Sequence, residues 1–196
     1  MVNHHSMRVD PLAWWTSEFA SFAPVGHVLR RHLSERWTRF HSLPESKRYA
    51  TDAAERDELL KRHLTVAGEL FEEGEPIYVY RSYVEEERLK GRRKHQLAGR
   101  QLREKVIRLP SDSNADTEVD HYCVRSLVTR WVPDFFEALT RQVAAWEESG
   151  VTFVSPSTKN IYSPYDGGMD VFPASISPGM LEAKFRSWMS ARADKL

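Results

Sequence analysis

Residues 151–173, VTFVSPSTKNIYSPYDGGMDVFP, alternate three apolar runs with two turn signals. The first turn lies at residues 156–160 and the second at Asp166-Gly167-Gly168. Asp-Gly is a strong hairpin signal because both central residues of a type I′ turn need a positive φ. The flanking runs contain the β-branched and aromatic residues that strands favour. The segment therefore predicts a three-stranded antiparallel meander between a helix that ends near Gly150 and a helix that begins near Ser177.

Helical spacing of apolar residues dominates the chain before this meander. It predicts helices that begin near Pro11 and Pro24, a long helix over about residues 51–71, and a helix from Pro133 that buries Phe135, Leu139, Val143 and Trp146. Residues 77–84 and 122–132 have the composition of strands. The predicted fold class is α+β, with N-terminal helices followed by an antiparallel or mixed sheet of about five strands and helices packed on one face.

The chain of 196 residues, 41% of them hydrophobic, is long enough for one substantial domain. We expect residues 1–9 to be a loose tail and residues 10–196 to be a single domain. The one cysteine, Cys123, excludes an intrachain disulfide and suits a reducing cytosol. No apolar run approaches the roughly 18 residues of a membrane span, and the N-terminus lacks the apolar core of a secretion signal. These features predict a cytoplasmic protein without membrane association.

Residues 85–120 are predicted to be a charged excursion from the sheet. Residues 88–108 contain nine Lys or Arg and a single acid, Glu104, and their apolar residues keep the spacing of an exposed helix. A basic helix of this kind is a candidate for contact with nucleic-acid phosphates or with an acidic protein, through Arg92, Arg93, Lys94, Arg100 and Arg103. The whole chain carries 28 Lys plus Arg and 28 Asp plus Glu. This neutrality favours a solvated arm over a nucleic-acid site.

A cationic cluster lies ahead of the long helix. Arg39, Lys47 and Arg48 form it, with His41 between them. Such a cluster near a helix N-terminus can hold a phosphate or carboxylate by charge-assisted hydrogen bonds. The alternative is that these cations pair with neighbouring acids, since the segment has no phosphate-loop pattern.

The second turn offers two carboxylates, Asp166 and Asp170, for acid–base chemistry or a divalent metal. Turn geometry already explains Asp166, and a cap at the strand start or an arginine partner explains Asp170, so two acids alone favour a structural role. The hairpin also groups polar and aromatic side chains as a recognition surface, which consists of Tyr162, Tyr165, Asp166, Gly167, Gly168 and Asp170.

Motifs for metals, cofactors and nucleophilic catalysis do not occur in the sequence. The eight histidines lack metal-site spacing, and His63 lies on an apolar helix face, where a hydrogen-bonded core histidine is expected. We expect no cofactor and no metal, and the sequence gives enzyme activity no positive support.

Two motifs resemble a bacterial domain family of unknown function. RFHSLPESKRYA at residues 39–50 resembles its N-terminal signature, and PYDGGMDVF at residues 164–172 resembles the C-terminal signature that a last helix follows. The order and spacing of both motifs fit over roughly residues 25–196. The resemblance implies one small intracellular bacterial domain with no established activity, substrate or cofactor.

The sequence thus predicts a non-catalytic cytoplasmic module of an accessory or immunity type that binds a protein partner through the basic excursion and the hairpin. One alternative is an enzyme or ligand-binding protein for a phosphorylated or carboxylated small molecule, with the cationic cluster on the anion and Asp166, Asp170 or His41 as acid or base. The other is RNA or DNA binding through residues 88–108.

Overall fold

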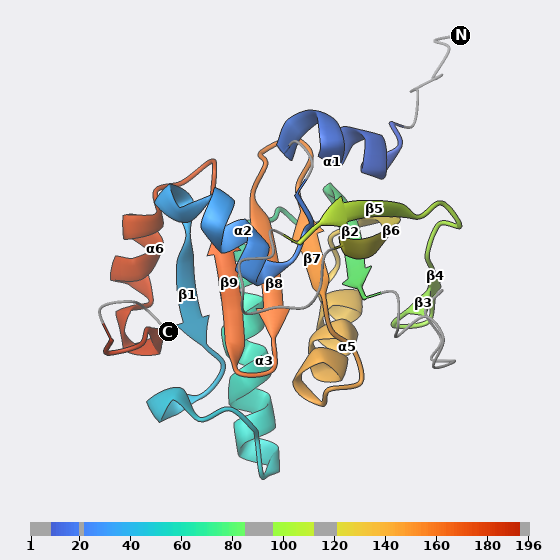
Figure 1. The fold of residues 1–196 in the computed structure, drawn as a ribbon. Helices are drawn as coiled ribbons and strands as arrows, with labels where there is room; N and C mark the ends of the chain where they lie inside the picture. The colour runs from blue at the N-terminus through green and yellow to red at the C-terminus, as the bar shows by residue number, and fades with distance from the viewer. Residues whose placement is uncertain (1–8, 20–21, 85–95, 112–120, 193–196) are drawn as a thin grey trace, which may run out of the picture.

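The computed structural model describes residues 9–19, 22–84, 96–111 and 121–192, and its centre is one antiparallel sheet. The seven strands lie in the order β1-β9-β8-β7-β2-β6-β5 (Figure 1). Their bounds are β1 (Thr38–His41), β2 (Pro76–Tyr83), β5 (Ile107–Pro110), β6 (His121–Arg130), β7 (Val151–Val154), β8 (Ile161–Tyr165) and β9 (Gly168–Phe172). The α+β class is confirmed, but the sheet has more strands than the five expected. The two outermost strands, β1 and β5, have four residues each, too few for a recognisable local pattern.

Helices pack against both faces of this sheet rather than one. On one face lie α1 (Pro11–Phe19) and α2 (Gly26–His32), and on the other lie α3 (Ala53–Gly68), α5 (Pro133–Ala144) and α6 (Pro178–Lys184). Strand β2 explains the arrangement, because Tyr78 and Tyr80 join the cluster of α1 and α2 whereas Ile77 and Val79 join the cluster of α3 and α5. A strand that is apolar on both sides needs two covering layers.

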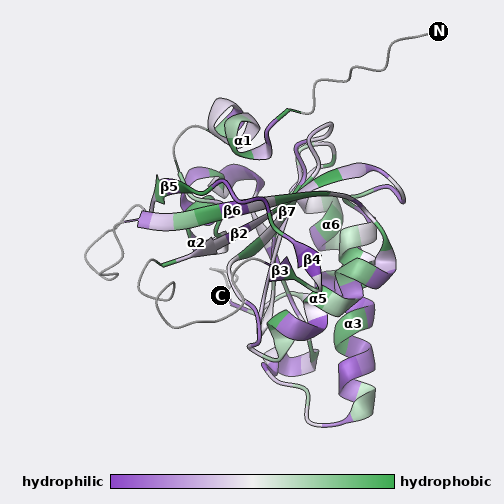
Figure 2. Ribbon diagram, turned by 90° about the vertical axis from the view of Figure 1, so that its right-hand side faces the viewer, coloured by the Kyte–Doolittle hydropathy of each residue, from purple (hydrophilic) through white to green (hydrophobic). Residues whose placement is uncertain are grey.

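Helix α3 follows its sequence signals closely. Asp52 caps its N-terminus, since its side chain accepts a hydrogen bond of 2.9 Å from the backbone N–H of Glu55. Figure 2 shows hydrophilic and hydrophobic stretches along the helix, and its buried residues include Leu59, His63 and Val66. In the described parts of the chain, no helix is long and apolar enough to cross a membrane.

The predicted meander is present as β7, β8 and β9, but its second turn differs from the expected type I′. Neither Asp166 nor Gly167 has a positive φ. The glycines instead allow β1 to approach: a Cβ atom on Gly168 would lie 2.3 Å from the carbonyl oxygen of Phe40. The Ser42 N–H also donates a 3.1 Å hydrogen bond to the carbonyl oxygen of Gly167.

The predicted basic helix is wrong within the described residues. Residues 96–111 contain the two-stranded ribbon β3 (Gln96–Leu97) and β4 (Arg100–Gln101) and then strand β5. Ala98 and Gly99 have positive φ values and turn the chain between β3 and β4. Leu97 and Leu102 are buried, so the apolar spacing reflects a folded-back ribbon. Arg92, Arg93 and Lys94, like residues 1–8 of the tail expected at residues 1–9, lie outside the described residues.

Candidate functional site

The pairing of β1 with β9 brings the two sequence motifs together. Arg39 lies opposite Asp170 in the register, and His41 lies opposite Gly168. The Arg39 guanidinium donates from Nε to Oδ1 of Asp170 at 2.8 Å and from Nη2 to Oδ2 at 3.0 Å. The indole Nε1 of Trp37 donates to the same Oδ1 at 2.8 Å. Asp170 is therefore a buried carboxylate that already has three strong donors.

Arg39 is held as firmly as its partner. Burial by itself lowers the pKa of Arg39, but the hydrogen bonds and the charge of Asp170 raise it above its ordinary value. The guanidinium carbon also lies 4.8 Å from the ring centre of Tyr165 and 5.6 Å from that of Trp37. The positive charge of Arg39 is thus already neutralised inside the fold.

The other members of the cationic cluster also have acidic partners. Nε of Arg48 pairs with the carboxylate of Asp166, to which the Tyr49 hydroxyl donates at 3.2 Å. Lys47 Nζ lies 2.5 Å from Oε1 of Glu55, and the hydrogen bond from Lys47 lowers the pKa of Glu55 to about 2. The neighbouring-acid alternative for this cluster agrees with these contacts.

A second polar group, on the face of the sheet that α3 covers, is a buried chain of three hydrogen-bonding side chains. The Ser42 hydroxyl lies 2.7 Å from Nε2 of His63, and the Tyr162 hydroxyl lies 2.6 Å from Nδ1. Burial lowers the pKa of His63 to about 3, so its ring is neutral, with one nitrogen donating and the other accepting. The expected core histidine is this one.

Burial also decides the roles of His41 and Tyr162, two residues proposed from the sequence. Ser42 and Tyr162 have no exposed surface, and His41 is 9% exposed. Tyr162 is therefore not accessible to a partner, and neither are Gly167, Gly168 and Asp170, so only Tyr165 and Asp166 of the predicted recognition surface are partly exposed. Burial lowers the pKa of His41, and the nearby Arg39 and Arg62 lower it further. The Ser42–His63–Tyr162 chain is buried among the described residues, and it ties α3 to β8.

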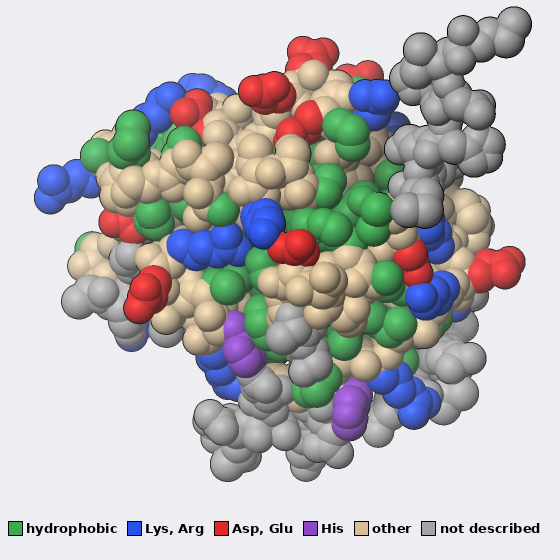
Figure 3. Space-filling model, turned by 90° about the horizontal axis from the view of Figure 1, so that it is seen from above, with side chains coloured by type: hydrophobic (Ala, Val, Ile, Leu, Met, Phe, Trp, Pro, Cys, Tyr) green, Lys and Arg blue, Asp and Glu red, His purple; other side chains and the backbone are tan. Residues whose placement is uncertain are grey.

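The described part of the basic excursion packs against the rest of the protein. Arg100 donates to the Thr129 hydroxyl and lies over the ring of Phe135 at 4.2 Å. Lys105 pairs with Asp10 at 2.5 Å. On the face shown in Figure 3, Lys and Arg side chains stand beside Asp and Glu rather than forming one basic surface. Among the described residues, no group of three His, Cys, Asp or Glu side chains could hold a metal ion.

Three exposed side chains meet where the first motif approaches the end of α5. We call Arg48, Tyr49 and Trp146 the aromatic patch. The Arg48 guanidinium carbon lies 5.7 Å from the ring centre of Tyr49 and 5.6 Å from that of Trp146. Tyr49 is 45% exposed and Trp146 57% exposed. The predicted burial of Trp146 is wrong because α5 ends at Ala144, and Trp146 adopts the left-handed conformation with a φ of 60°.

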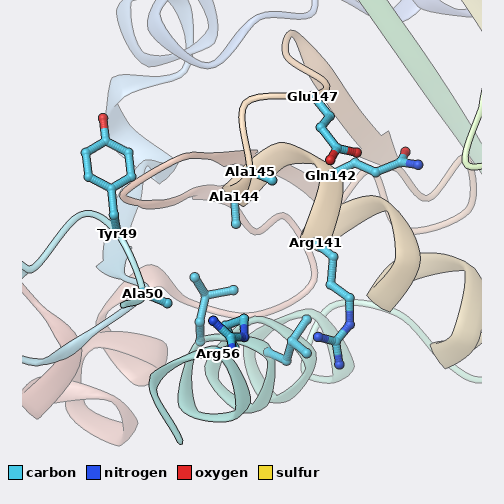
Figure 4. A pocket seen from close by; sticks show the side chains of 10 residues that line it. Tyr49, Ala50, Arg56, Arg141, Gln142, Ala144, Ala145 and Glu147 are labelled. Atoms are coloured by element: carbon cyan, nitrogen blue, oxygen red, sulfur yellow. The ribbon is translucent and has the colours of Figure 1, made fainter. Parts of the chain in front are cut away.

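A pocket of about 330 Å³ opens beside the aromatic patch, between α3 and α5 (Figure 4). Tyr49 belongs to both the patch and the pocket. The other lining side chains are the apolar Ala50, Leu59, Leu60, Ala144 and Ala145 and the polar Arg56, Arg141, Gln142 and Glu147. Figure 4 shows Arg56 and Arg141 on the α3 side of the pocket and Glu147 on the opposite side.

A family model described as Domain of unknown function (DUF3885) matches residues 25–193. The chain belongs to this family. No curated protein and no solved structure matches it. The match spans both motifs and every strand of the main sheet of the DUF3885 domain.

Sequence reasoning missed the pocket of the DUF3885 domain entirely. Its walls come from residues 49–60 and 141–147, which are far apart in the chain and meet because α3 packs against α5. Arg56 and Arg141 each lie in an ordinary helical charge pattern, so no local signal distinguishes them. Only the packing of the two helices places both guanidinium groups at one cavity.

Proposed function

We propose that this DUF3885 domain is a non-catalytic cytoplasmic module that binds a protein partner through the aromatic patch and the adjoining pocket. The observation that carries the proposal is the state of Trp146. Its large apolar side chain is 57% exposed, and its backbone is left-handed. The left-handed conformation costs a non-glycine residue about 1–2 kcal/mol.

Folding alone gives little reason for a tryptophan at this position. Glycine or asparagine adopts this conformation after a helix more readily. An exposed indole contributes little to the core, so its presence at this position points to a contact outside the chain. Trp, Tyr and Arg are also the residue types that dominate binding energy at protein interfaces, and the aromatic patch contains one of each.

The states of the catalytic candidates support a binding role. Asp166 and Asp170 each hold an arginine, and His41 is buried. The cations proposed for a phosphorylated or carboxylated small molecule, Arg39, Lys47 and Arg48, are the partners of acids. These contacts disfavour both acid–base chemistry at the hairpin and anion capture by the first motif.

Site-specific photocrosslinking tests the proposal in the cells that produce the protein. A benzoylphenylalanine in place of Trp146 is expected to crosslink a discrete protein. The matched control carries the same group in place of Met180, which is 68% exposed on α6. Trp146→Ser should also abolish co-purification of the crosslinked protein. The same products from both positions, or none from position 146, would refute the proposed contact surface.

A further inference from the structure

We propose that the pocket between α3 and α5 binds the carboxyl-terminal residue of the partner chain. The terminal carboxylate would bind Arg56 and Arg141, and the terminal side chain, an apolar one, would lie on Leu59 and Leu60. The inference rests on the proposed function and specifies the chemistry of the partner.

The charges around the pocket are arranged for such a group. Within the described residues, the Arg56 guanidinium makes no ion pair. Arg141 pairs with Glu137 at 2.7 Å, but these side chains are 49% and 39% exposed. Exposed pairs four residues apart on a helix are weak and exchange readily. Two guanidinium groups on one side of a cavity match the planar, divided charge of a carboxylate.

The size and floor of the pocket suit a single residue. Its volume of about 330 Å³ is at the lower end of ligand sites, which range over about 300–1,000 Å³. Leu59 and Leu60 are almost fully buried and present an apolar floor. The small side chains of Ala50, Ala144 and Ala145 leave the space above this floor open.

Continuity with the aromatic patch favours a polypeptide over a free small carboxylate. Tyr49 lines the pocket and also contacts Arg48 in the patch, so a chain leaving the pocket would cross the patch. Glu147 stands opposite the two arginines and can accept the backbone N–H of the terminal residue (Figure 4). A small carboxylate the size of one amino acid would fill the pocket without contacting Arg48 or Trp146.

Fluorescence anisotropy with the purified full chain tests the inference. The probes are fluorescein-labelled tetrapeptides that end in Leu, Val or Phe, each as the free acid and as the C-terminal amide. At least one acid should bind about tenfold or more tightly than its amide, since hydrogen bonds to charged groups are the strong ones. Arg56→Gln and Arg141→Gln should each remove most of this preference. The control is Arg186→Gln, at an exposed arginine that does not line the pocket, and it should leave the preference unchanged.

Two further arms identify the source of the carboxylate and the place of binding. Ala145→Phe should fill the pocket and abolish binding of the acids without removing a charge. Unlabelled N-acetyl-leucine should compete about tenfold or more weakly than the unlabelled leucine-ending tetrapeptide. In Trp146→Ser the affinities of the two competitors should be closer, because only the tetrapeptide reaches Trp146.

The inference is overturned if no acid binds better than its amide up to about 1 mM, a limit that corresponds to roughly 4 kcal/mol of binding free energy. It is also overturned if N-acetyl-leucine competes as well as the tetrapeptide, because the ligand would then be a free small molecule. Either result together with a specific crosslink from position 146 would leave the proposed function standing.

Discussion

Arg39 and Asp170 face each other across β1 and β9 and form a two-point ion pair that joins the two motifs of the DUF3885 domain. The Asp170 side chain is 4% exposed and that of Arg39 14% exposed. Trp37 adds a third donor to the carboxylate. The second motif thus supplies the buried anion that lets the first motif add β1 to the edge of the sheet.

Asp170→Asn should lower the free energy of unfolding by about 3 kcal/mol. The substitution leaves the nearly buried charge of Arg39 without its counter-charge, and breaking such pairs costs about 3–5 kcal/mol. Urea unfolding of the purified variant measures the change. Asp166→Asn is the matched control, because Arg48 is 56% exposed and water screens the charge that the substitution leaves, so the loss there should be clearly smaller. Equal losses for the two variants would contradict a structural role specific to Asp170.

Stability should fall with acidification through His63. Its pKa is about 3 in the folded protein and about 6.5 in the unfolded chain. Above pH 6.5 neither state carries this proton, so the stability contribution of the neutral ring is fully present. As the pH falls from about 6.5 toward 3, the unfolded chain binds a proton that the folded protein excludes. The free energy of unfolding then decreases by up to about 1.4 kcal/mol per pH unit.

Urea unfolding between about pH 7.5 and 4.5 tests this dependence. In the acidic part of the range, the free energy of unfolding should fall more steeply with pH for wild type than for His63→Gln. The difference in slope should approach about 1.4 kcal/mol per pH unit, which corresponds to one proton. The titration of the wild-type imidazole by NMR gives a direct reading that does not depend on a folded variant. An imidazole of His63 that titrates near pH 6.5 would refute the prediction.

Gly168→Ala should destabilise the protein by about 1–3 kcal/mol, the usual cost of overpacking. The added Cβ would lie 2.3 Å from the carbonyl oxygen of Phe40 and 2.8 Å from the Tyr165 hydroxyl, so β1 must move. Hydrogen exchange at residues 38–41 should accelerate as the edge pairing loosens. Gly179→Ala is the control, since its nearest neighbour would be the Ser177 hydroxyl at 3.6 Å and alanine favours the helix. A loss for both variants would point to a general intolerance of alanine instead.

Trp146→Gly should raise stability by about 0.5–1 kcal/mol while it abolishes partner binding. Glycine removes the cost of the left-handed backbone, in part offset by its greater freedom in the unfolded chain. Thermal unfolding and the crosslinking partner's co-purification report the two effects separately. Lys159→Gly is the control, because Lys159 has a φ of 61° at a different turn. Its ion pair with Glu18 is exposed and weak, so this variant should not lose binding and should gain less stability than Trp146→Gly. If Trp146→Gly still binds the partner, partner binding does not explain the strained tryptophan.

Much of the fold could be read from local signals. The meander followed from two turns within 23 residues, and α3 and α5 followed from apolar spacing that starts after Asp52 and at Pro133. His63 was expected in the core because it lies on the apolar face of α3. Each of these features depends on residues that are close in sequence, where the periodicity of helix or strand decides which side chains face inward.

The strands at both edges and the candidate site depend on residues far apart in the chain. β1 exists because β9 offers it hydrogen bonds and Asp170 receives Arg39, and neither condition can be seen in the four residues of β1 alone. The apolar residues around the ribbon at residues 96–101 have helical spacing in the sequence. Only the positive φ angles and the packing show that the chain folds back on itself there. Trp146 fits the apolar stripe of α5, yet the helix ends two residues before it. Arg56 and Arg141 reach one cavity only through the packing of α3 on α5.

Local sequence thus sets periodicity and turns, whereas ion pairs, edge pairing and cavities arise from contacts whose free energy exists only once distant segments meet.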